Sequence, residues 1–345
     1  MSGALGPLAV TMGDPAGVGL ELTGMAWLRR HAEGLPAFVM LGSVAALRER
    51  FATLGFDIPI AAVPSPRAAA SVFATSLPVI DMALANPARP GVADPANGAA
   101  VIASIEGAVG AVVSGEAAAV VTNPIAKSVL YRAGFRHPGH TEFLADLAHR
   151  HYPDAPCEPV MMIASDSLNV VPLTIHIPLK AVPGAITTEA IIATSRIIAA
   201  ALRRDFGIAH PRIVVAGLNP HAGEDGAIGS EDRDIIAPAI AKLRAEGIDV
   251  TGPHPADTLF HAARRSSYDC VLGMYHDQVL IPAKTLAFDT GVNVTLGLPF
   301  VRTSPDHGTA FDIAGKGIAS PASLIAAMKL AMRMSERRAA HAGRA

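Results

Sequence analysis

The stretch from Leu8 to Arg30 reads LAVTMGDPAGVGLELTGMAWLRR and decides the class of fold. Residues 8–12 are mostly apolar, as in a buried strand, and a glycine-dense turn runs from Gly13 to Gly19. Beyond the turn, apolar residues recur at spacings of three and four, which is the period of a helix. The stretch therefore predicts a strand, a turn and a helix, the repeating unit of an α/β protein.

The same unit recurs along the chain. Short runs rich in Val, Ile and Leu are followed by a Gly, Asn or His turn and then by a helical pattern, which indicates a covered, mainly parallel sheet. The strands are predicted at residues 8–12, 37–41, 118–122, 159–163, 170–175, 212–217 and 270–274. The helices are predicted at residues 19–30, 44–52, 97–114, 188–204, 235–246 and 321–338. The proline- and alanine-rich stretch 61–95 is predicted to be an irregular connection.

Length and composition exclude several classes of protein. A chain of 345 residues favours two closely packed domains over one core. The formal net charge is −2 and the basic residues are scattered, so we expect neither a nucleic-acid nor a membrane partner. Cys157 and Cys270 are too few for a disulfide framework or a thiolate zinc cluster. Together with the absence of a signal-peptide pattern, they predict a cytoplasmic protein.

Three histidines lie where predicted strands end: His176, His221 and His276. In open α/β sheets this edge binds ligands. Three neutral imidazoles with open positions could form a catalytic metal site that polarises a substrate oxygen. A single histidine in a turn is more often a hydrogen-bonded structural residue, but three in equivalent places favour a shared site.

Two polar segments could bind anions. Residues 306–317, DHGTAFDIAGKG, precede the last helix and resemble the adenosine-binding loop of isocitrate and isopropylmalate dehydrogenases. Those enzymes hold NAD(P) without the G-x-G-x-x-G fingerprint, and the turn at residues 13–19 also lacks it. By themselves, the glycines of that turn could equally well form an ordinary turn with no role in ligand binding. Lys284, Asn293 and Arg302 follow the His276 strand, and His140 opens a helix, a combination that suits a phosphate group. For any one of these cations a solvated surface role remains the alternative.

Several motifs make the whole chain resemble the 4-hydroxythreonine-4-phosphate dehydrogenase family of pyridoxal 5′-phosphate synthesis. They are TNPIAK at 122–127, GHTEFLA at 139–145, GLNPHAGE at 217–224, YHDQ at 275–278, GVN at 291–293 and RTS at 302–304. Two departures are Asp14, where some members carry Glu, and His254, at a position that is often Leu.

The resemblance implies an isocitrate/isopropylmalate dehydrogenase-like fold and a homodimer with shared active sites. The fold has two α/β/α domains with an active-site cleft between them. Residues 1–136 with 290–345 would form the domain on the side of the cofactor loop, and residues 137–289 the domain on the side of the metal and the dimer.

The resemblance also implies roles for individual residues. His176, His221 and His276 would bind a divalent metal, Zn, Mg or Co. The substrate contacts would be His140, Thr141, Lys284, Asn293 and Arg302. The NAD(P) contacts would be His307, Gly308, Thr309, Ala310 and Asp312. Lys284 and His140 are the catalytic candidates, and a metal-bound hydroxide is another possible base.

The implied reaction oxidises the C3 hydroxyl of 4-phosphohydroxy-L-threonine with NAD(P), and the resulting β-keto acid loses CO₂ to give 3-amino-2-oxopropyl phosphate. A sister dehydrogenase acting on 4-phospho-threonate or 4-phospho-erythronate would keep every residue named above. Two more distant alternatives are a phosphate acyltransferase, which would need neither the histidines nor the adenosine loop, and a binding protein without catalysis.

Overall fold

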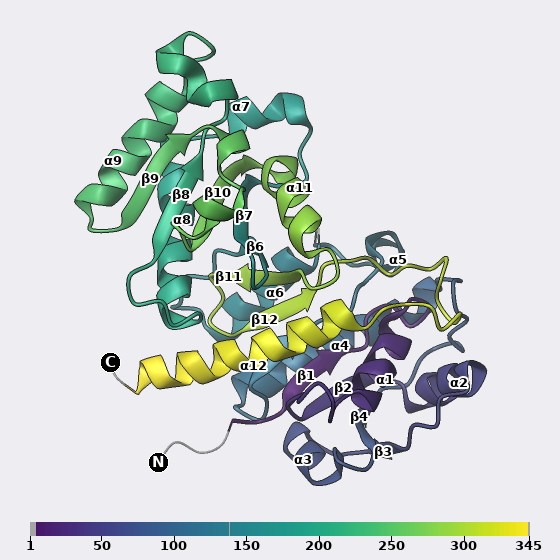
Figure 1. Cartoon of the computed structure of the whole chain (residues 1–345). Coiled ribbons are helices and arrows are strands. Elements are labelled where there is room, and N and C mark those ends of the chain that lie inside the picture. Colours follow the sequence, from purple (N-terminus) through teal and green to yellow (C-terminus); the bar gives the residue numbers. More distant parts are fainter. Residues whose placement is uncertain (1–4, 138, 344–345) are drawn as a thin grey trace. The chain divides into compact units, whose positions relative to one another are not determined.

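The computed structural model describes residues 5–137 and 139–343 (Figure 1). The chain forms two compact units, one of Met1–Pro159 with Leu298–Glu336 and the other of Val160–Gly297 with Arg337–Ala345. The boundaries of these units differ from those of the expected domains. Residues 137–159 were expected in the second domain and belong to the first unit, whereas residues 290–297 were expected in the first domain and belong to the second unit. Both units combine helices with a mainly parallel sheet, which confirms the predicted α/β class.

The strands of the first unit lie in the order β3-β4-β2-β1-β5-β12, and each pair of neighbours is parallel. β1 and β2 are buried along their whole length, as their apolar sequences require in a sheet covered on both sides. The strands are β1 (Leu8–Thr11), β2 (Phe38–Gly42), β3 (Ile60–Ala62), β4 (Leu77–Asp81), β5 (Ala119–Val121) and β12 (Arg302–Pro305). The helices are α1 (Gly19–Leu28), α2 (Val44–Leu54), α3 (Ala69–Val72), α4 (Gly98–Val113), α5 (Lys127–Arg132), α6 (His140–His151) and α12 (Ala322–Ala342), whose end belongs to the second unit.

The helix α4 packs against β1 and β2. Its Ser104 hydroxyl bonds to backbone groups next to β1 and within β2, at 2.9 and 2.7 Å. With the turn before it, the stretch Pro95–Val113 is long and apolar enough to cross a membrane. Its packing on the sheet explains this apolar character as that of a core helix. Leu179–Ala185 and Thr188–Arg204 meet the same criterion only together, and they are bent by 90°.

The strands of the second unit lie in the order β11-β6-β7-β10-β8-β9. The pairs β11–β6 and β6–β7 are antiparallel, and the remaining pairs are parallel. The strands are β6 (Val160–Ala164), β7 (Asn169–Thr174), β8 (Arg212–Ala216), β9 (Asp249–His254), β10 (Cys270–Tyr275) and β11 (Val292–Leu296). The helices are α7 (Val182–Ala185), α8 (Thr188–Arg204), α9 (Ala237–Ala245), α10 (Ala262–Arg265) and α11 (His276–Ala287), and α11 packs on β7 and β10.

The prediction of an irregular connection at residues 61–95 was wrong. This stretch contains α3 and β4, and β3 runs into it. β4 pairs with β2 and with β3, and its first three residues are buried. Pro78 and the many alanines nearby do not give the sequence pattern expected of a strand. The strand forms because neighbouring strands, rather than local propensity, stabilise it.

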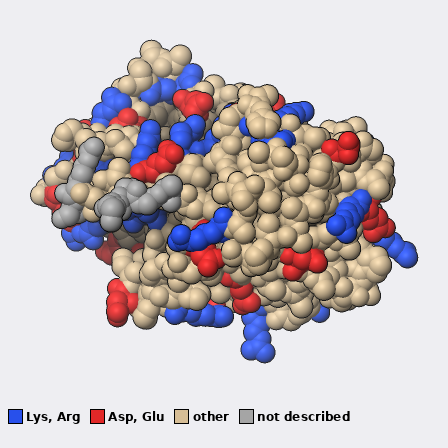
Figure 2. Space-filling view, turned by 90° about the horizontal axis from the view of Figure 1, so that it is seen from below, with Lys and Arg blue, Asp and Glu red and all other residues tan. Residues whose placement is uncertain are grey.

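Acidic and basic side chains are interspersed on the face of the molecule in Figure 2. Charged side chains of the protein also pair across elements, as Arg196 does with Glu246 at 2.6 Å and Arg212 with Asp269 at 2.9 Å. The face shown therefore mixes both signs of charge, in keeping with a formal net charge of −2.

Candidate active site

His176 and His276 lie at one edge of the sheet in the second unit. His176 follows β7, His276 begins α11 directly after β10, and these strands are parallel neighbours with Thr174 opposite Tyr275. The Thr174 hydroxyl donates to the Met274 carbonyl at 2.8 Å and ties the strand ends together. The two imidazole ring centroids are 5.8 Å apart. Strand pairing therefore brings two of the predicted metal ligands together.

Asp277 orients the His276 ring, since its Oδ1 lies 2.7 Å from Nδ1 of His276. A carboxylate at this nitrogen favours a proton on Nδ1 and leaves a lone pair on Nε2, the usual arrangement in metal-binding histidines. A pocket of about 380 Å³ opens beside the two rings. It is lined by Thr174, His176, Ile177, Leu179, Val182, Tyr275, His276 and Asp277.

His221 lies on a strained turn after β8. Residues 221–225 have positive φ angles between 46° and 78°, and only one of them is glycine. Residues with side chains reach this region at a cost in free energy. Asp232 is 1% exposed, and its carboxylate accepts two backbone N–H groups just before the turn, at 2.8 and 3.1 Å. A buried carboxylate thus holds the loop that presents His221.

The three histidines do not gather within one chain. Among residues 5–137 and 139–343, no three His, Cys, Asp or Glu side chains are close enough together to hold a metal ion. One chain offers the pair His176 and His276, which His221 does not join in a group able to hold a metal. The structure of one chain therefore brings together two of the three predicted metal ligands.

Arg302 and His140 form a second cluster, in the first unit. Arg302 is 3% exposed, and its Nε and Nη2 donate to the Thr122 hydroxyl at 3.2 and 2.6 Å. Burial lowers the pKa of Arg302 to about 10, so the guanidinium stays charged at neutral pH. Burial, followed by the charges of Arg302 and Lys127, holds the pKa of His140 well below its usual value. The cluster thus joins a buried cation to a neutral imidazole.

The Nε2 atom of His140 is buried and has no hydrogen-bond partner within the described part of the chain. A buried nitrogen without a partner costs free energy, and a bound ligand would supply the missing hydrogen bond. Thr141 follows in the first turn of α6, whose N-cap residue Gly139 makes no side-chain cap. The free N–H groups of this helix end suit an anionic group.

Lys284 and Asn293 belong to the second unit. Lys284 lies in α11, which His276 begins, and Asn293 lies in β11 opposite Ile163 of β6. The predicted substrate residues therefore divide into His140, Thr141 and Arg302 in the first unit and this pair in the second.

The predicted cofactor residues form an extended loop after β12. The Thr309 carbonyl accepts the Val18 N–H at 3.0 Å, and Asp306 N–H donates to the Ser323 hydroxyl at 3.1 Å. His307, Gly308 and Asp312 are exposed, whereas Thr309 and Ala310 are half-buried. A side chain added at Gly308 would meet nothing within 4 Å. The backbone of the loop is thus anchored, while its polar side can reach a ligand.

Sequence reasoning assigned no role to Asp277, Asp232 or Lys127. Asp277 lies in the quoted YHDQ motif, and Lys127 ends the quoted TNPIAK motif. A carboxylate directly after a candidate metal ligand was a signal for Asp277. Asp232 had no such signal, because its contacts with residues 218 and 219 appear only once the turn is folded.

Comparisons with known proteins show the family to which the chain belongs. A family described as "Pyridoxal phosphate biosynthetic protein PdxA" matches residues 35–331. The 4-hydroxythreonine-4-phosphate dehydrogenase of Xanthobacter autotrophicus is 55% identical, over 98% of this chain and 96% of its own length. That of Bradyrhizobium diazoefficiens is 57% identical, over 95% and 97%. A solved structure of the enzyme from Klebsiella pneumoniae is 38% identical with a TM-score of 0.85, covering 97% of this chain and 99% of its own. The chain belongs to the PdxA family of pyridoxal phosphate biosynthetic proteins.

Proposed function

We propose that the protein oxidises the C3 hydroxyl of 4-phosphohydroxy-L-threonine with NAD(P), as a step of pyridoxal 5′-phosphate synthesis. The observation that carries this proposal is the buried Arg302 guanidinium beside the neutral His140 imidazole, in a chain 55% identical to an enzyme named for that substrate. A charged guanidinium and a helix N-terminus together favour a phosphate group.

The residues that would hold a divalent metal are His176 and His276 of one chain and His221 of another. The observations favouring this are the ring separation of 5.8 Å and the Asp277 carboxylate at Nδ1 of His276, which leaves Nε2 of that ring for a ligand. Zn, Mg and Co remain the candidates. A bound metal would polarise the substrate hydroxyl and lower the pKa of its proton.

The chain's own residues would bind and orient the substrate and move its proton. Arg302 and the first turn of α6 would hold the phosphate. Binding of the phosphate would then position the reacting carbon at another point of the substrate. His140 is neutral, so it can accept a proton, and Lys284 is the other candidate base. Bound NAD(P)⁺ would supply the acceptor for the C3 hydride, and the base would take the hydroxyl proton. Cleavage of the C–C bond to the carboxylate would then release CO₂ and leave its electron pair in an enolate, and a proton delivered to the former α-carbon would give 3-amino-2-oxopropyl phosphate.

A homodimer with shared active sites is supported by apolar side chains beside the histidines. Ile177 and Leu179 follow His176, and they are 40% and 68% exposed. On α11 and just beyond it, Ile281 and Phe288 are 64% and 77% exposed. Exposed apolar groups in one region mark an interaction surface. A second copy covering this surface would bring its own residues close to the His176–His276 pair.

The proposal is tested by NAD(P)H formation from 4-phosphohydroxy-L-threonine, before and after removal of divalent metal. We expect activity that chelation abolishes and that Zn²⁺, Mg²⁺ or Co²⁺ restores. The runner-up is a sister dehydrogenase, and a higher kcat/KM for 4-phospho-threonate or 4-phospho-erythronate would favour it. Absence of NAD(P)H formation with all three substrates in the presence of metal would refute both.

Variants of the cofactor loop test the assignment of NAD(P). Gly308→Val should raise the Kd of NADH or NADPH at least about tenfold, because the new side chain would project into the open space beside the loop that this assignment gives to the cofactor. Asp312→Ala should weaken binding in the same direction. Calorimetric titration measures both, with unchanged metal content as the control. Wild-type affinity in both variants would place the cofactor elsewhere.

A further inference from the structure

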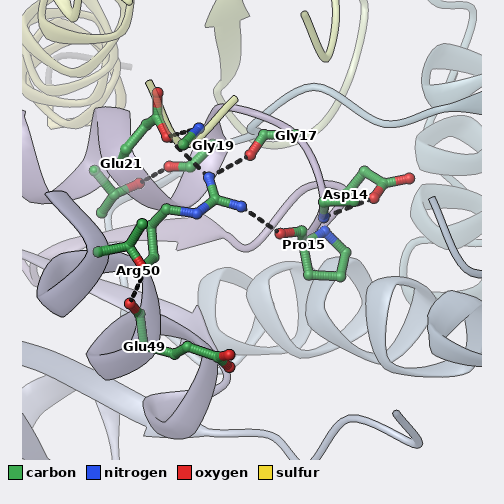
Figure 3. A network of polar contacts seen from close by, with 11 residues as sticks. Asp14, Pro15, Gly17, Gly19, Glu21, Glu49 and Arg50 are labelled. Carbon is green, nitrogen blue, oxygen red and sulfur yellow. Dashed lines mark hydrogen bonds and ion pairs between the residues drawn. The ribbon is translucent and has the colours of Figure 1, made fainter. Parts of the chain in front are cut away.

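An ion pair is buried between α1 and α2 in the first unit (Figure 3). Arg50 Nη1 lies 2.9 Å from Glu21 Oε2, and the two residues are 2% and 0% exposed. Desolvating two charges costs free energy that their attraction offsets only with further hydrogen bonds. The other contacts of the pair therefore indicate what it does.

The Arg50 guanidinium reaches into the glycine-dense turn at residues 13–19. Its Nη1 donates to the Gly17 carbonyl at 2.9 Å and its Nη2 to the Pro15 carbonyl at 3.2 Å. Figure 3 shows the guanidinium between Glu21 on one side and these carbonyls on the other. The planar guanidinium presents its donors in a fixed fork, so two of its nitrogens serve all three acceptors at once. Arg50 therefore fixes the shape of the turn.

The turn and Glu21 in turn hold the proposed cofactor loop. The Val18 N–H donates to the Thr309 carbonyl at 3.0 Å, and Glu21 Oε2 accepts the Gly315 N–H at 2.7 Å. A side chain at Gly17 would come within 2.8 Å of the Thr309 carbonyl oxygen, so only glycine allows this approach. Glu21 thus contacts the loop directly at Gly315, and the turn that Arg50 holds contacts it at Thr309.

We propose that Arg50 and Glu21 are positioning residues for the cofactor, because their buried pair fixes residues 309–315 in the conformation that binds NAD(P). This inference rests on the proposed cofactor loop. The second carboxylate oxygen of Glu21 has no hydrogen-bond partner within the described residues. The buried charge of Glu21 is thus held by Arg50 and the Gly315 N–H, and loss of Arg50 disturbs the turn and the loop together.

The test compares Arg50→Met, the double variant Arg50→Met with Glu21→Leu, and wild type, all as full-length protein. Replacing both partners by apolar side chains removes the buried charges and should return the thermal midpoint Tm toward wild type. It does not return the hydrogen bonds to residues 15, 17 and 315. In both variants we therefore expect the Kd of NADH or NADPH to rise at least about tenfold, with faster hydrogen exchange across residues 306–317. The cofactor KM should rise while kcat changes little.

The matched control is Asp205→Asn in the second unit, which perturbs a carboxylate that is 1% exposed and paired with Arg204 and Arg338. It should lower Tm and leave the cofactor Kd unchanged. Glu21→Gln keeps an oxygen for the Gly315 N–H and should retain more affinity than the double variant. Wild-type exchange at residues 306–317, or wild-type cofactor Kd in Arg50→Met and the double variant, would overturn the proposal. If the cofactor Kd is that of wild type, Gly308→Val shows which proposal has failed. Normal cofactor binding by Gly308→Val as well would refute the cofactor loop itself. Weak cofactor binding by Gly308→Val would refute only the role of the Arg50–Glu21 pair.

Discussion

Mixing the His221→Ala variant with either His176→Ala or His276→Ala should restore about a quarter of wild-type activity after joint refolding. Mixing His176→Ala with His276→Ala should restore none. Each variant alone should be nearly inactive, because loss of one of three ligands removes both affinity and geometry from the metal. The reason for the asymmetry is that His176 and His276 lie together in one chain, with ring centroids 5.8 Å apart, whereas His221 does not complete a group of three ligands with them.

The expected recovery follows from counting dimers. Random pairing makes about half of the dimers hybrid. In a hybrid of His221→Ala and His176→Ala, one site lacks both residues and the other is intact, so about a quarter of all sites are active. In a hybrid of His176→Ala and His276→Ala, each site draws its pair from one damaged chain, and both sites are dead.

Two tagged versions of the chain, purified in tandem, show whether hybrids have formed, and metal content of the hybrids provides a readout apart from activity. A hybrid with one intact site should hold about half of the wild-type metal. Activity in the mixture of His176→Ala and His276→Ala would show that these residues serve different sites. Inactive hybrids in all three mixtures would show that each chain builds its own metal site.

Pattern reading predicted the parts of the fold that local sequence determines. β1, β2, β5, β8 and β10 are apolar on both faces, and each lies within about two residues of its predicted range. β4 and β11 escaped prediction because partners stabilise them: β4 pairs with β2 and β3, and β11 runs antiparallel to β6. Strand pairing between distant segments leaves little trace in either segment alone.

The site was predictable to the extent that its residues follow strands. His176 and His276 were expected at one edge because their strands were expected in one parallel sheet, and the structure places them there. The neutral state of His140 could not be foreseen, since it results from burial beside Arg302 and Lys127. The Arg50–Glu21 pair also had no sequence signal, because the two residues meet only when α1 and α2 pack together.

Arg302→Ala should lower kcat/KM for 4-phosphohydroxy-L-threonine at least about tenfold, since a charge-assisted hydrogen bond contributes roughly 1.5 to 3 kcal/mol. The guanidinium is buried and charged, so a phosphate group beside it would be held in a site from which water is largely excluded. The same variant should show a much smaller loss with 4-hydroxy-L-threonine, which has no phosphate. Steady-state kinetics with the two substrates separates loss of phosphate binding from general damage to the protein. Arg302→Lys should retain part of the kcat/KM for the phosphorylated substrate, because it keeps a positive charge.

The Arg302→Ala variant should also change the pH dependence of kcat/KM. The charge of Arg302 is the second cause, after burial, of the lowered pKa of His140, so its removal raises that pKa toward the ordinary value. If His140 is the base, it must be neutral to act, and the acidic limb of the profile should move to higher pH in the variant. Thr122→Val is the matched control, because it removes the hydroxyl that Arg302 contacts and leaves the charge in place. Unchanged kinetics with the phosphorylated substrate would exclude Arg302 from the site, and an unmoved acidic limb would leave Lys284 as the stronger candidate for the base.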